Sequence, residues 1–143
     1  MSTSPAPPTV LVVEDNMDTA DSIARFLRVA AGFSVRVAYD GAAGVKAALA
    51  EKPTAVVCDI SLPRLNGLQV ANQLSGLNPR QLLIAVTAYD GAYTEELAYA
   101  AGFDHYIVKP ADPFALESIV QDHVRRLQTP DLNGEPPSPR GSS

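Results

Sequence analysis

The chain has 143 residues, which is enough for one domain with a buried core. Hydrophobic residues make up 46% of it, a proportion typical of globular proteins rather than of disordered or fibrous ones. The formal net charge is −5, so the overall charge does not attract a phosphate backbone. We therefore expect no direct binding to DNA or RNA.

Several features of the chain predict a cytoplasmic location. Cys58 is the one cysteine, so an internal disulfide is excluded, which is consistent with a reducing compartment. No apolar stretch is long enough to span a bilayer. Residues 1–8 are rich in Pro, Ser, Thr and Ala and lack the charged start and apolar core of a signal peptide. We expect them to form a flexible lead.

The first predicted elements alternate between strand and helix. Residues 9–13 form a short run rich in β-branched side chains, which predicts a buried strand. Asn16 is a suitable N-cap for a helix over residues 18–30, where apolar side chains recur at helical spacing, and Gly32 is its expected C-terminal stop. Residues 33–38 alternate apolar and polar side chains, which predicts a second strand.

The middle of the chain continues this alternation. The turn residues Asp40-Gly41 precede an alanine-rich helix over residues 42–51, which Pro53 ends. Residues 55–59 form the next buried strand, and this apolar run stops abruptly at a carboxylate. A proline-containing loop follows, and then apolar residues at helical spacing predict a helix that ends near Gly76.

The last third of the chain supplies two more strands and two more helices. In chain order these are a strand over residues 82–86 that ends in Thr87, a turn at Asp90-Gly91, a helix over residues 94–101 with Gly102 as its stop, a strand over residues 105–108 that ends in Lys109-Pro110, and a helix capped by Asp112 that reaches Leu127. Residues 128–143 are rich in Pro, Gly and Ser, so we expect a disordered tail after a single domain over residues 9–127.

Five strands that alternate with five helices through short connections predict an α/β fold, with a parallel sheet covered by helices on both faces. Right-handed crossovers favour the doubly wound, flavodoxin-like (βα)5 arrangement with strand order 2-1-3-4-5. In that order the first and third strands are neighbours, and the fourth and fifth follow. Five polar groups are then expected to converge at the carboxyl edge of the sheet: Glu14, Asp15, Asp59, Thr87 and Lys109.

The three carboxylates in this group require positive charge. At about 4 Å and an effective dielectric of about 20, each pair of carboxylates repels by about 4 kcal/mol. Lys109 supplies one positive charge, and a divalent cation would supply the other two. Ligands that are all oxygen suit Mg²⁺ or Mn²⁺ better than zinc, and the sequence has no His/Cys cluster.

Such a site has a defined chemistry. An aspartate carboxylate is a plausible acceptor for a phosphoryl group, and a bound metal would neutralise the charge that develops on the phosphoryl oxygens. Lys109 would hold another of these oxygens as a point charge, and the Thr87 hydroxyl would donate a hydrogen bond to a third. The sequence therefore predicts phosphoryl transfer to Asp59.

Several stretches, each at or near a predicted strand or helix end, together resemble the CheY-like receiver domains of bacterial two-component response regulators. They are Leu11-Val12-Val13-Glu14-Asp15-Asn16, Asp40-Gly41, Asp59-Ile60-Ser61-Leu62-Pro63 to Gly67, Thr87-Ala88-Tyr89, Ala101-Gly102-Phe103-Asp104 and Tyr106-Ile107-Val108-Lys109-Pro110. No single stretch is specific, but the ordered combination is highly specific. It extends over about residues 9–127.

This resemblance implies a role for each acidic residue. Asp59 is the implied phosphoacceptor. Glu14 and Asp15 are implied to bind Mg²⁺, with Asp15 the more direct ligand. Asp59 and the backbone carbonyl of Ser61 complete the implied metal ligands.

The resemblance also implies how phosphorylation would be transmitted. Thr87 and Lys109 are implied to contact the phosphoryl group, and Tyr106 is the implied aromatic switch that moves inward with Thr87. The Lys109-Pro110 peptide bond is implied to be cis. Tyr89 stands beside the acceptor, and its bulk is predicted to affect hydrolysis of the acyl phosphate by water.

The implied function is a phosphorylation-dependent switch that catalyses its own phosphoryl transfer and then loses the phosphate slowly. The phosphoryl donor would be a phosphohistidine on a sensor histidine kinase or a histidine phosphotransfer protein, docked near Met17 and Asp18. The fourth helix, fifth strand and fifth helix would form the face that binds an unknown target protein. We expect either a stand-alone receiver or a receiver that is part of a longer protein, and the Met1 start and the low-complexity ending favour the first.

Other functions are compatible with parts of the sequence. A constitutive protein-interaction module that takes no phosphate, a pseudo-receiver, is the alternative, and the complete acceptor set argues against it. A flavodoxin-like hydrolase or phosphatase would need a second acid or base near Asp59, and we identify none. A nucleotide-binding protein would need a glycine-rich phosphate loop after the first strand, which the sequence lacks.

Overall fold

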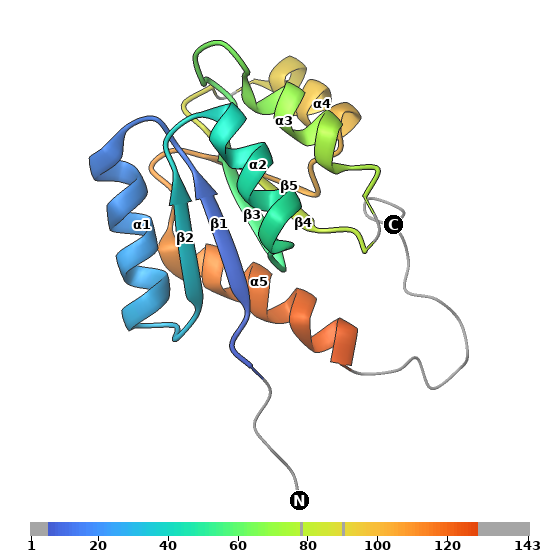
Figure 1. Ribbon diagram of the computed structural model, residues 1–143. Coiled ribbons are helices and arrows are strands. Elements are labelled where there is room, and N and C mark those ends of the chain that lie inside the picture. The colour runs from blue at the N-terminus through green and yellow to red at the C-terminus, as the bar shows by residue number, and fades with distance from the viewer. Residues whose placement is uncertain (1–5, 78, 90, 129–143) are drawn as a thin grey trace, which may run out of the picture.

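The computed structural model describes residues 6–77, 79–89 and 91–128. Part of the expected N-terminal lead, Asp90 of the predicted Asp90-Gly91 turn, and residues 129–143 of the expected tail lie outside these described residues. The described chain folds into one parallel five-stranded sheet with helices on both faces (Figure 1). The strand order is β2-β1-β3-β4-β5, as the alternation of elements predicted.

The elements lie within a few residues of the predicted positions. In chain order they are β1 (Thr9–Val13), α1 (Met17–Val29), β2 (Ser34–Ala38), α2 (Gly41–Glu51), β3 (Ala55–Asp59), α3 (Gly67–Leu74), β4 (Leu82–Thr87), α4 (Ala92–Ala101), β5 (His105–Val108) and α5 (Pro113–Gln128). The predicted C-cap residue of one helix was wrong. The C-cap of α1 is Ala30 rather than Gly32, and Gly32, with a φ of 75°, makes the turn after it, where the Phe33 amide donates to the Leu27 carbonyl at 2.9 Å.

Successive strand residues point into two separate apolar layers. Val56 and Cys58 of β3 belong to the layer covered by α2, α3 and α4. Ala55 and Val57 belong to the layer covered by α1 and α5. Every residue of β3 and β4 is buried, as expected for central strands of a sheet that is covered on both faces.

Cys58 lies in the first of these layers and is fully buried. Burial raises the pKa of this thiol far above its ordinary value, and the charges of Asp59 and Glu14 act in the same direction. The thiol is therefore neutral at physiological pH.

Among the described residues, no helix combines the length and the apolar character needed to cross a membrane.

The register of the sheet brings the carboxyl ends of the strands to the same edge. Val13 is paired with Cys58, Asp59 with Val86, and Thr87 with Val108. The residues that follow β1 and β5, and the last residues of β3 and β4, therefore lie at one edge of the sheet. The predicted polar groups occupy these positions.

The difference in burial between two leucines predicts an unequal cost for truncating them to alanine. Leu74 of α3 is 0% exposed, whereas Leu49 of α2 is 47% exposed. We expect Leu74→Ala to lower the free energy of unfolding by about 3 kcal/mol, because it leaves a cavity in a closely packed layer. Leu49→Ala should cost about 0.5 kcal/mol. Urea denaturation of both variants checks this, and equal losses would contradict the assigned packing.

Candidate functional site

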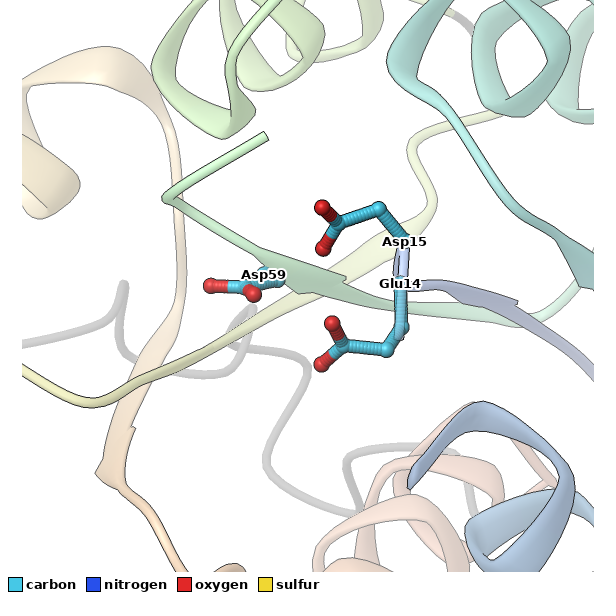
Figure 2. Close-up of side chains that lie close together, drawn as sticks. All are labelled: Glu14, Asp15 and Asp59. Carbon is cyan, nitrogen blue, oxygen red and sulfur yellow. The ribbon is translucent and has the colours of Figure 1, made fainter. Parts of the chain in front are cut away.

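Three carboxylates meet at the carboxyl edge of the sheet. Glu14 and Asp15 follow β1, and Asp59 is the last residue of β3. Figure 2 shows that Glu14 and Asp15 direct their carboxylates toward the side of the sheet edge where Asp59 lies, and one oxygen from each of the three lies within 4.8 Å of the others. Glu14 is 3% exposed and Asp59 is 5% exposed, whereas Asp15 is open to solvent.

Lys109 bridges the two buried carboxylates. Its Nζ lies 2.6 Å from Glu14 Oε1 and 3.0 Å from Asp59 Oδ2. Lys109 directly follows β5, so its side chain extends past the end of β4 to reach these groups. The predicted positive charge is therefore present, and it contacts two carboxylates at once.

Backbone amides bind the remaining oxygens of the same two carboxylates. The Asn16 amide donates to Glu14 Oε2 at 3.1 Å, and the Ser61 amide donates to Asp59 Oδ1 at 3.0 Å. These donors fix the orientation of both side chains. These donors were not predicted from the sequence, because every residue type except proline carries a backbone amide and its direction depends on the loop conformation.

The environment shifts two titrating groups. Burial raises the pKa of Glu14, and the Asp59 charge adds to this, against the opposing hydrogen bonds from Lys109 and the Asn16 amide. For Lys109, burial lowers the pKa, but the hydrogen bonds to Glu14 and Asp59 outweigh it and the net pKa is raised. Lys109 is therefore positively charged at physiological pH, while the buried Glu14 carboxylate favours additional positive charge nearby.

Thr87 and Tyr106 are connected through Tyr89. Thr87 is fully buried at the end of β4, and its Oγ1 accepts a hydrogen bond from the Tyr89 amide at 3.2 Å. The half-buried Tyr106 donates its hydroxyl to the Tyr89 carbonyl. The Thr87 carbonyl also accepts from the Lys109 amide at 2.7 Å. These residues were predicted from the sequence, but their connection through the backbone of Tyr89 was not. The Lys109-Pro110 bond is cis, as the resemblance implied.

The donor set fits a hard divalent cation. Within the described ranges, Glu14, Asp15 and Asp59 form the one group of three or more acidic, histidine or cysteine side chains close enough to hold a metal. All of their donor atoms are carboxylate oxygens, which favours Mg²⁺ or Mn²⁺ over zinc. Asp15 is exposed, whereas Glu14 and Asp59 are buried. The Glu14 carboxylate is also already hydrogen-bonded by Lys109 and the Asn16 amide.

The position of Lys109 predicts a cost for removing its charge. Without a divalent cation, Lys109→Met should lower the free energy of unfolding by about 2 kcal/mol, because two buried carboxylates lose a charged donor. Lys46→Met is the control, since Lys46 is an exposed lysine of α2. Chemical denaturation in a chelating buffer at neutral pH checks this, and equal stability of the two variants would refute the assigned role of the Lys109 charge.

A family model and the similar known proteins point to the same family. Residues 10–121 match the response regulator receiver domain. Response regulator MprA of Mycobacterium tuberculosis is 35% identical over 111 residues, which are 78% of this chain and 46% of that protein. The probable transcriptional regulatory protein TcrX of the same species is 35% identical over 114 residues, which are 80% of this chain and 47% of that protein. The chain thus spans about half the length of the curated relatives it matches.

Solved structures show the same fold. The CheY-like receiver domain protein from Methanospirillum hungatei matches with a TM-score of 0.79 and 25% identity, over 86% of this chain and 98% of that one. The receiver domain of sensor histidine kinase PA1611 from Pseudomonas aeruginosa matches with a TM-score of 0.75 and 29% identity, over 84% of this chain and 99% of that one. That structure has a magnesium ion coordinated in its active site cleft. The fold, the acidic group and these matches show that the chain belongs to the response regulator receiver domain family.

Proposed function

We propose that this chain is a phosphorylation-dependent switch of a two-component phosphorelay, with Asp59 as the phosphoacceptor. The phosphoryl group would leave the imidazole nitrogen of a phosphohistidine and form a bond to a carboxylate oxygen of Asp59. The observation that carries this proposal is the placement of Asp59. It is buried at the end of a central strand, 3.0 Å from the Lys109 ammonium and beside two further carboxylates.

The acidic residues would hold Mg²⁺, with Mn²⁺ as a substitute. Asp15, Asp59 and the Ser61 carbonyl are the proposed direct ligands, and Glu14 supports them from its buried position. When bound, the cation neutralises charge on the phosphoryl oxygens. The Ser61 amide holds Asp59 Oδ1 in place, so the carboxylate keeps one orientation during the transfer.

Lys109 and Thr87 would stabilise the transferred group. The Lys109 ammonium already lies beside Asp59 Oδ2, so it is close to where the phosphoryl oxygens would develop charge. The Thr87 hydroxyl accepts from the Tyr89 amide and can donate its own proton to a phosphoryl oxygen. Both groups are supplied by strand ends, which favours a fixed geometry.

The connection from Thr87 to Tyr106 is the proposed route of the signal. A shift of Thr87 toward the phosphoryl group would pull on the Tyr89 amide, and the Tyr89 carbonyl is the acceptor for the Tyr106 hydroxyl. The adjoining surface on α4 carries exposed apolar side chains, with Tyr93 74% exposed and Leu97 38% exposed. We assign binding of the target protein to the face formed by α4, β5 and α5.

The phosphoryl donor would dock at the start of α1. Met17 is 57% exposed, and next to it a hollow of about 570 Å³ lies between the first turns of α1 and residues 109–111. We assign docking of a sensor histidine kinase or a histidine phosphotransfer protein to this position, because the hollow borders Lys109, which contacts Asp59. We propose a cytoplasmic location, a receiver domain over residues 9–127, and protein partners rather than nucleic acid for this stretch.

Intact mass spectrometry tests the acceptor directly. Incubation with Mg²⁺ and acetyl phosphate should add the mass of one phosphoryl group. The adduct should be absent from Asp59→Asn and in the presence of a chelator, because the acceptor oxygen or the neutralising charge is then missing. A folded protein that takes no adduct under any of these conditions would instead support the constitutive pseudo-receiver.

The lifetime of the phosphoprotein tests the role of Tyr89. This side chain is 58% exposed and follows Thr87 closely. We expect Tyr89→Ala to shorten the half-life of the acyl phosphate, because less bulk would stand between water and the phosphoryl group. Tyr93→Ala is the control, since Tyr93 is also an exposed tyrosine but lies in the first turn of α4, four residues after Tyr89. Loss of the phosphate can be followed by mass after removal of the donor, and an unchanged half-life would contradict the shielding role.

A further inference from the structure

The first residue of α2 lies unusually close to the loop that joins β3 to α3. A Cβ atom on Gly41 would overlap the carbonyl oxygen of Leu65 and would lie 3.1 Å from both the carbonyl carbon and the Cβ of that residue. Gly41 does not have a positive φ, so its backbone conformation is open to any residue. Close approach to Leu65 alone therefore excludes a side chain at this position.

The loop that Gly41 contacts is the one that orients the phosphoacceptor. Ser61 lies in the same loop as Leu65, and its amide donates to Asp59 Oδ1 at 3.0 Å. The loop is braced from within, because the Leu62 and Gly67 amides both donate to the Ile60 carbonyl, at 3.0 and 2.9 Å. A displacement at Leu65 is therefore transmitted to Ser61.

The two ends of this loop also approach each other closely. A Cβ on Gly67 would lie 2.6 Å from the Ile60 Cα. Ile60 and Leu62 are 8% and 6% exposed, and both pack in the layer covered by α2, α3 and α4. The loop thus lies close to the starts of two helices, and a side chain at Gly41 or at Gly67 would meet its backbone.

The helix that carries Gly41 is constrained as well. A Cβ on Gly44 would lie 2.8 and 2.9 Å from the two methyl groups of Val13, so α2 is seated closely on the end of β1. Val13 directly precedes Glu14 and Asp15. A side chain at Gly41 must displace either the loop that carries Ser61 or the helix that packs against the end of β1.

We propose that Gly41 is a positioning residue for the metal and phosphoacceptor site, acting through Leu65 on the loop that carries Ser61. This inference rests on the proposed function of that site. Gly41 touches none of the reacting groups. Its role is to permit the close contact between α2 and the loop that keeps the Ser61 amide and carbonyl beside Asp59.

Comparison of Gly41→Ala with Gly76→Ala tests this role. A Cβ on Gly76 meets nothing within 4 Å, and its φ is not positive, so it is a matched control. The dissociation constant for Mg²⁺, measured by titration calorimetry, should rise about tenfold in Gly41→Ala, as is typical when support of a metal ligand is lost. Labelling by acetyl phosphate should also slow at saturating Mg²⁺. Unchanged values for Gly41→Ala would overturn the proposal.

Two NMR measurements separate failure of this inference from failure of the proposed function. If the unmodified protein binds no Mg²⁺, the proposed function fails, and the metal-free spectra still decide the role of Gly41. The Ser61 amide resonance should shift in Gly41→Ala and not in Gly76→Ala, and an unshifted resonance refutes the role. If Gly41→Ala does not fold, Mg²⁺ titration of the unmodified protein decides instead. The Gly41 amide should then shift while the Gly76 amide does not, and no shift at Gly41 refutes the role.

Discussion

The contact of one ammonium group with two buried carboxylates is the constraint on which the site depends. Parallel strands place their carboxyl ends at one edge, so Glu14 and Asp59 are brought together by the sheet itself. Two carboxylates at about 4 Å repel by about 4 kcal/mol at an effective dielectric of about 20. Lys109, at 2.6 and 3.0 Å from them, offsets this repulsion with one positive charge, so the three carboxylates of the site keep two uncompensated negative charges. This residual negative charge would attract a divalent cation.

The sheet supplies a rigid platform for this charge balance. β3 and β4 are buried throughout, and their side chains are shared between two apolar layers. Asp59 at the end of β3 therefore cannot move away from its neighbours, and the charged groups must find their partners in place. The backbone amides of Asn16 and Ser61 do so without adding charge, which leaves the site negative overall.

The alternation of apolar runs and turns was enough to predict the strand order, and the strand order was enough to predict which polar residues meet. Glu14, Asp15 and Asp59 were predicted in this way, and the structure brings them together. Contacts that depend on loop conformation were not predictable. The amide of Ser61 and the carbonyl of Tyr89 are backbone groups without a sequence signature. The helix was predicted to reach Ala30, but its C-cap was assigned to Gly32 because a glycine shortly after a helix is a plausible stop.

The contacts on the two sides of Asp59 differ in stiffness. Toward α2, the loop after β3 is held by close backbone approaches at Gly41 and Gly67, where no side chain fits. Toward α4, Thr87 is connected to Tyr106 by single hydrogen bonds through Tyr89, a residue that is more than half exposed. A change at Asp59 would therefore be accommodated mainly on the α4 side, because hydrogen bonds near solvent exchange at small cost whereas close-packed backbone does not move without opening space. This asymmetry would give the proposed signal a direction, because the α2 side keeps the geometry that the proposed phosphoryl transfer needs, whereas the α4 side can change its contacts.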